Sequence, residues 1–140
     1  MKGVYKMINS NEKIIPFLTF CGTAEEAMNY YVSVFPNSKV ISLTHISKED
    51  RGEEGKVLTG IIELKGQQFM VMDMEKEYCP AFTWAISLYI DCRDEEEFDM
   101  LFTKLSDGGV VMMGPEAILN LRKVAWVTDK FGVTWQLVWM

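Results

Sequence analysis

The expected secondary structure of this chain runs through one series twice: a strand, a helix and three strands, then the same again. The helical segments align at a shift of 71 residues, which sets Cys21 against Cys92. Weak identity with a shared pattern is typical of a duplicated unit, and one copy is too small to close a core alone. The sequence therefore predicts an α+β fold. In it, two βαβββ modules, about 13–74 and 83–139, pair curved mixed sheets around a cleft within one domain of residues 1–140.

The element boundaries follow from apolar periodicity and from turn residues. Helices are expected after Thr23, where Glu26 completes a capping-box pattern, and after Asp94, which has Glu97 three residues on. A charged, glycine-rich loop is expected over 47–56. The expected strands span 13–20, 39–46, 57–64, 67–74, 84–90, 110–113, 122–128 and 134–139. Residues 113–120 are expected to form a loop with one helical turn.

Composition excludes several classes of function. The chain has 140 residues, 49% of them hydrophobic, and a net charge of −6. That charge argues against nucleic acid and against an anionic membrane surface as partners. The N-terminus lacks the apolar core of a signal peptide, and the three cysteines are far apart and odd in number. We therefore expect a cytoplasmic protein with reduced thiols and no disulfide framework.

Three segments carry a resemblance to a known family: IIPFLTFCGTAEEAMNYYVSVFPNSKV, AISLYIDCRDEEEFDMLFTKLSDGG and WVTDKFGVTWQLV. Together they resemble the PhnB-like group of the vicinal oxygen chelate superfamily, which includes glyoxalase I, extradiol dioxygenases and antibiotic-resistance proteins. That group is often labelled 3-demethylubiquinone-9 3-methyltransferase-like. The resemblance implies a glyoxalase-like fold and a homodimer.

The resemblance also implies where metal ligands would fall, because metal-dependent members take one ligand from each of four strands. The implied positions are Ile15 or Pro16, Met70, a residue within 85–87, and Gln136. None is a His, Cys, Asp or Glu, and a thioether is a poor ligand for a hard divalent ion. We therefore expect no metal at this site and no cofactor. Whether Asp73 or His45 binds an ion alone stays open.

The methyltransferase label finds no support in the glycines. A methyl donor such as S-adenosylmethionine usually binds at a glycine-rich turn between a strand and a helix. The glycine pairs of this chain follow helices or lie in hairpins. We therefore expect no methyl transfer.

Four residues are the candidates for an apolar ligand-binding cleft. Gln136 lies on the strand face opposite Trp135 and could orient a ligand through its amide. Met70 could line an adaptable apolar wall, and Trp84 and Trp126 could stack on a ring. For each of the four, ordinary packing or a satisfied amide is the alternative.

Cys21 and Cys92 raise a further question, because a thiol just before a helix can have a lowered pKa. Only His45 could serve either as a base, so buried structural cysteines are the simpler interpretation.

The sequence thus predicts a small-molecule-binding protein that lacks the superfamily's metal site, with no catalytic residue identified. One alternative is a lyase, isomerase or dioxygenase-type enzyme with a non-standard metal site. The other is a dimeric structural or regulatory module whose cleft is filled by its own side chains.

Overall fold

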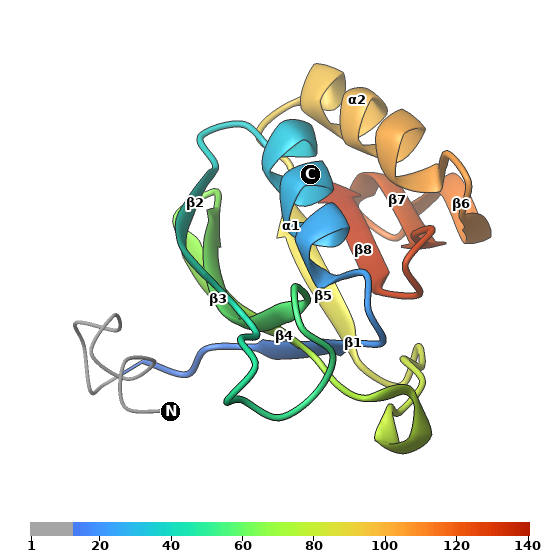
Figure 1. Cartoon of the computed structure of the whole chain (residues 1–140). Helices are drawn as coiled ribbons and strands as arrows, with labels where there is room; N and C mark the ends of the chain where they lie inside the picture. The colour runs from blue at the N-terminus through green and yellow to red at the C-terminus, as the bar shows by residue number, and fades with distance from the viewer. Residues whose placement is uncertain (1–12) are drawn as a thin grey trace. The chain divides into compact units, whose positions relative to one another are not determined.

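A computed structural model describes residues 13–140, which divide between Pro80 and Ala81 into two compact units (Figure 1). The elements of unit 1 are β1 (Phe17–Phe20), α1 (Ala24–Val34), β2 (Lys39–His45), β3 (Val57–Leu64), β4 (Gln67–Asp73) and the short 3-10 helix η2 (Lys76–Tyr78). The elements of unit 2 are β5 (Ser87–Asp91), α2 (Glu95–Ser106), β6 (Val110–Ile118), β7 (Leu121–Thr128) and β8 (Thr134–Trp139).

Both units have the same topology. The strand order is β1-β4-β3-β2 in one sheet and β5-β8-β7-β6 in the other. In each, the first strand pairs parallel with the last, and the remaining neighbours pair antiparallel. This confirms the predicted α+β fold and the repeated βαβββ series. The cleft between the two sheets stays a prediction.

In unit 1, helix α1 covers one face of the sheet. A Cβ added to Gly60 would collide with the end of the Met28 side chain, so the helix lies directly over this part of β3. Successive strand residues alternate between faces. Ile61 and its register partner Met70 therefore lie on the opposite face.

In unit 2, helix α2 packs on β7 and β8. Lys123 of β7 forms ion pairs with Glu95 and Asp99 of this helix, which fixes the face that the helix covers. The core residues of that face are Ala125, Val127, Trp135 and Leu137. Trp126 and its register partner Gln136 lie on the opposite face.

The two helices begin differently. The Asp94 side chain accepts a hydrogen bond from the Glu97 backbone N–H at 2.8 Å, so α2 starts with the expected side-chain cap. The Thr23 side chain makes no such bond, so the predicted capping box at α1 is wrong. The carboxylate of Asp73, at the end of β4, takes its place and accepts from the Gly22 and Ala24 backbone N–H groups.

Three predicted strands differ from the structure by more than one residue at an end. β1 begins at Phe17 because Pro16 just before it cannot donate to a sheet, and β5 begins at Ser87 rather than 84. β6 continues to Ile118, so the predicted loop over 113–120 is mostly strand. Neither helix of residues 13–140 is long and apolar enough to cross a bilayer.

Candidate functional site

Two of the candidate residues form an aromatic pair in unit 2. The Trp84 and Trp126 ring centroids are 6.2 Å apart at an interplanar angle of 40°. The sequence predicts Trp84 on a strand. It lies instead in the turn before β5, where it is 61% exposed. Trp126 is half-buried on β7. An exposed indole against a second ring offers a flat apolar surface to a ligand.

Gln136 lies beside this pair, because it is the register partner of Trp126. Its Nε2 donates a hydrogen bond to Ser87 Oγ at 2.8 Å. This bond fixes the amide plane, so the carbonyl oxygen is the group that Gln136 can offer to a ligand donor. Tyr89 of β5 pairs in register with Gln136, lies on the same face and is exposed. We call Trp84, Ser87, Tyr89, Trp126 and Gln136 the aromatic face of unit 2.

Met70, the fourth candidate, belongs to unit 1. It is buried and packs with Ile61, against which Ile15 and Ile41 also lie. Two side-chain oxygens on the same face lack a hydrogen-bond partner although they are buried: Thr59 Oγ1 and Gln68 Oε1. A buried oxygen without a partner loses its hydration, which typically costs about 1–3 kcal/mol. This face of unit 1 therefore combines an apolar centre with two unsatisfied polar atoms.

Neither residue considered for lone ion binding stands free. His45 Nε2 lies 2.7 Å from Glu25 Oε1 at the surface of unit 1. Asp73 is buried, and its two oxygens accept from three backbone N–H groups, those of Gly22, Ala24 and Val57. Within residues 13–140, no three His, Cys, Asp or Glu side chains gather closely enough to hold a metal ion.

A cavity of about 670 Å³ opens at the Asp73 end of the unit 1 sheet. Its walls are the turn before α1, part of the 47–56 loop with its flanks, and the segment that follows β4. The charged side chains in its lining are Glu53, Lys56, Asp73, Glu75, Lys76 and Glu77. Lys56 Nζ donates to the Gly22 carbonyl oxygen at 3.1 Å, and Arg51 Nη1 lies 3.1 Å from Glu75 Oε1. The lining of this cavity is therefore rich in charged side chains, and it includes none of the four residues that we predict for an apolar cleft.

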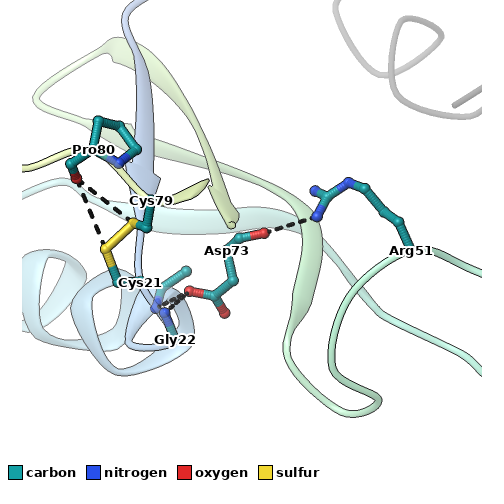
Figure 2. The surroundings of a disulfide bond; sticks show 7 residues. Cys21, Gly22, Arg51, Asp73, Cys79 and Pro80 are labelled. Carbon is teal, nitrogen blue, oxygen red and sulfur yellow. Dashed lines mark hydrogen bonds between the residues drawn. A yellow bond between two sulfur atoms is a disulfide. The ribbon is translucent and has the colours of Figure 1, made fainter. Parts of the chain in front are cut away.

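A disulfide joins Cys21, before α1, to Cys79, after η2, with Cα atoms 5.7 Å apart (Figure 2). The expectation that all three cysteines are reduced is therefore wrong. The two positions are 58 residues apart in sequence, and the return of the chain after β4 brings them together. Cys92 is a buried thiol outside the disulfide, as expected of a structural cysteine.

Sequence reasoning missed Ser87, Tyr89, Thr59, Gln68 and the cavity. Ser87 could have been found, because it falls at the midpoint of the expected strand over 84–90, which pairs with the strand of Gln136. The unpartnered state of Thr59 and Gln68 depends on neighbours that no local pattern shows. The cavity depends on a loop, a turn and a connector meeting in space.

The chain is similar to several proteins of known structure. The PhnB protein of Bacillus cereus is 40% identical, with a TM-score of 0.86 over 92% of this chain and 100% of that chain. A glyoxalase/bleomycin resistance protein from Albidiferax ferrireducens has a TM-score of 0.56 at 10% identity, over 91% of this chain and 99% of that one. The fosfomycin resistance protein FosX of Listeria monocytogenes, complexed with Mn(II) and sulfate, has a TM-score of 0.63 at 10% identity, over 92% and 90%. No curated protein matches the chain.

The fold is that of the glyoxalase/bleomycin resistance protein and of FosX. A family model described as 3-demethylubiquinone-9 3-methyltransferase matches residues 12–138. The chain belongs to that family, the PhnB-like group whose motifs it carries.

Proposed function

We propose that the protein binds a small, ring-bearing organic molecule on the aromatic face of unit 2. The observation that carries this proposal is the Trp84–Trp126 pair, because its outer indole is exposed although it packs on a second ring. Gln136, held by Ser87, adds a directed polar group within the same face. A ligand with a planar ring and a hydrogen-bond donor fits this combination.

Benzamide and cyclohexanecarboxamide test the proposal, because both carry the same amide and only benzamide has an aromatic ring. We expect benzamide to bind more tightly and to shift the indole N–H signals of Trp84 and Trp126 in NMR spectra. Trp84→Ala should weaken benzamide binding about tenfold, as expected for a lost stacking contact. Tyr78→Ala is the matched control, since it removes an exposed aromatic ring from unit 1. Benzamide binding that survives Trp84→Ala unchanged would refute the site.

Met70 is proposed as a ligand contact on the helix-opposed face of unit 1. What supports it is the pair of unpartnered oxygens of Thr59 and Gln68 on the same face, which a polar ligand group could satisfy. Native mass spectrometry of untagged protein would reveal a carried small molecule. Met70→Ala protein should then retain less of it.

We also propose that the protein works without a resident metal. The fold family includes a Mn(II)-bound FosX, but Met70 and Gln136 stand where the resemblance implies ligands. A thioether and one neutral amide do not fit a hard divalent ion, which prefers carboxylate oxygen or imidazole nitrogen. Stoichiometric manganese or zinc in the purified protein, with turnover that depends on it, would favour the enzyme alternative.

A methyltransferase activity, as the family description would suggest, is not part of this proposal. The turn after β1 contains Gly22 and leads into α1, which is where a nucleotide-like donor could dock. There the Asp73 carboxylate already accepts the Gly22 and Ala24 N–H groups. An S-adenosylmethionine titration followed by calorimetry should therefore give no binding heat.

We propose a homodimer as the assembly. The supporting observation is β6, which ends the strand order of its sheet and exposes Val110, Val111 and Met112 in succession. An edge strand with exposed apolar side chains is a template for pairing with a second copy. Light scattering at micromolar concentration should give the dimer mass.

The remaining parts of the proposal rest on composition. The net charge of −6 argues against nucleic acid and membrane surfaces as partners. A cytoplasmic location is also proposed, and fractionation of cells that produce the protein would test it.

A further inference from the structure

The segment Lys76–Pro80, which carries η2, is tied to the turn before α1 by the Cys21–Cys79 disulfide (Figure 2). Its backbone hydrogen bonds are local: the Tyr78 N–H donates to the Glu75 carbonyl and the Cys79 N–H to the Lys76 carbonyl. Tyr78 is 74% exposed, and Lys76, Glu77 and Pro80 are exposed as well. Among the described residues, the disulfide is the covalent bond that holds this segment against the turn before α1.

The residues just before this segment are held independently of the disulfide. Arg51 Nη1 donates to the Asp73 carbonyl oxygen at 3.2 Å and to Glu75 Oε1 at 3.1 Å. The Asp73 side chain binds the start of α1 and of β3. Loss of the disulfide should therefore release Lys76–Pro80 and leave the chain up to Glu75 in position.

The disulfide is accessible, and an acceptor for a reduced thiol is already in place. Cys21 is exposed and Cys79 is half-buried. The Pro80 carbonyl oxygen lies 3.8 Å from Cys21 Sγ and 3.6 Å from Cys79 Sγ. In the disulfide neither sulfur carries a proton, so these contacts become hydrogen bonds only after reduction. Exposed disulfides are typically the exchangeable ones.

We propose that Cys21 and Cys79 form a thiol–disulfide exchange site for low-molecular-weight thiols of the glutathione class. A thiolate attacks the exposed Cys21 Sγ, a mixed disulfide forms, and the Cys79 sulfur leaves and takes a proton from solvent. A second thiol then attacks the mixed disulfide, which frees Cys21 and releases the oxidised small disulfide. Two small thiols thus lose two electrons, the protein disulfide gains them, and the oxidised small disulfide drives the reverse reaction.

The exchange acts on the cavity of unit 1 that the charged side chains line. Lys76 and Glu77 line one wall, and Cys21, Gly22 and Thr23 line another. The disulfide joins these two walls, so its reduction lets one of them move. In a cytoplasm, where disulfides are transient, the thiol pool would therefore set the state of the cavity. This inference does not depend on ligand binding by unit 2.

Hydrogen–deuterium exchange of the full chain, read by mass spectrometry, tests both parts of the proposal. Protein is equilibrated with millimolar reduced or oxidised glutathione, and its free thiols are counted by native-state alkylation. We expect no labelled thiol in the oxidised sample and two in the reduced one, with Cys92 protected in both because it is buried. Amides of 76–79 should exchange about tenfold faster after reduction, and those of β3 and β4 should not change.

Two variants separate the local device from general damage. The double variant Cys21→Ser, Cys79→Ser should show the fast exchange at 76–79 in either buffer. Cys92→Ser is the matched control and should keep the response of the unaltered chain. A disulfide that resists millimolar glutathione, or thiols that stay free in oxidised glutathione, would overturn the exchange site. Faster exchange throughout the unit 1 strands would overturn the local release, because the bond would then be structural.

Discussion

The carboxylate of Asp73 joins three segments of unit 1. Its Oδ1 accepts from Gly22 N at 2.9 Å and Ala24 N at 3.0 Å, and its Oδ2 accepts from Val57 N at 3.0 Å. The turn before α1, the start of β3 and the end of β4 thus meet at one buried side chain. Hydrogen bonds to a charged acceptor are stronger than neutral ones, typically about 1.5–3 kcal/mol each.

Asp73→Asn tests this junction with little change in shape. An amide keeps one acceptor oxygen but turns an NH₂ toward one of the three N–H groups, so at least one buried donor loses its partner. We expect the free energy of unfolding to fall by about 2–4 kcal/mol. Circular dichroism in urea is the measurement, because all four tryptophans lie in unit 2 and fluorescence would miss unit 1. Glu26→Gln, an exposed change in α1, should stay within about 0.5 kcal/mol, and equal losses in both variants would contradict the junction.

Glu75 provides a prediction about pH. A hydrogen bond from its own backbone and then the Arg51 guanidinium lower the pKa of the Glu75 carboxyl. A lowered pKa in the folded state means that the carboxylate stabilises the fold above the unfolded-state pKa. This contribution is lost as the pH falls through the folded-state pKa. Arg51→Met should raise the pKa of Glu75 toward its ordinary value, as followed by carboxyl carbon NMR across the acidic range. Lys48→Met removes the same charge from the same loop and should leave the pKa of Glu75 at its lowered value.

Single residues show which kind of capping a sequence can predict. Asp94 caps α2 through a bond to a residue three positions away, so the local pattern is sufficient. Asp73 caps α1 from a position 49 residues beyond Ala24, and this contact depends on the pairing of β1 with β4. The local pattern at Thr23 therefore pointed to the right helix start and the wrong capping group.

At the scale of elements, two glycines allow strands to approach their neighbours closely, and they differ in what they approach. A Cβ on Gly109, just before β6, would collide with the backbone carbonyl of Thr128, which cannot move without shifting β7. A Cβ on Gly60 would meet side chains instead of backbone, namely the flexible end of Met28 and, at 3.0 Å, Val71 Cγ2. We expect Gly109→Ala to lower the free energy of unfolding by about 3 kcal/mol and Gly60→Ala by about 1–2 kcal/mol. Urea unfolding of the two variants is the comparison, and the reverse order would contradict this account.

The element that sequence patterns described least well is β6. Gly114 and Pro115 interrupt its apolar pattern, and its pairing with β7 is irregular at several points. Such interruptions usually indicate a loop, but strand β7 supplies a partner along the whole length. By contrast, β3 and β4 were expected within one residue of their limits, because Lys65 and Gly66 close their hairpin with positive φ angles.

At the scale of the whole molecule, the duplication was predictable because the expected series of elements occurs twice along the sequence. The structure agrees, since the two units share their strand order and their pairing directions. The disulfide was not, since it depends on a turn and a connector that lie 58 residues apart. The candidate residues show the same limit. Register patterns placed Gln136 opposite the helix-covered face, but only the fold brings Trp84, from a turn, against Trp126.

The proposed dimer gives the last prediction, which concerns the exposed edge of unit 2. Val110 is 62% exposed and lies at the start of β6, the last strand in its sheet. Val110→Lys adds a charge to this edge, a change by which natural edge strands avoid pairing, while the monomer loses little because the side chain is already in solvent. Sedimentation velocity should show a dimer for the unaltered chain and a weaker or absent one for Val110→Lys. Leu119→Lys makes the same chemical change at a 97% exposed position in the turn after β6 and should keep the dimer. If Val110→Lys stays dimeric, the dimer contact lies elsewhere. If the unaltered chain is a monomer, the proposed homodimer is wrong.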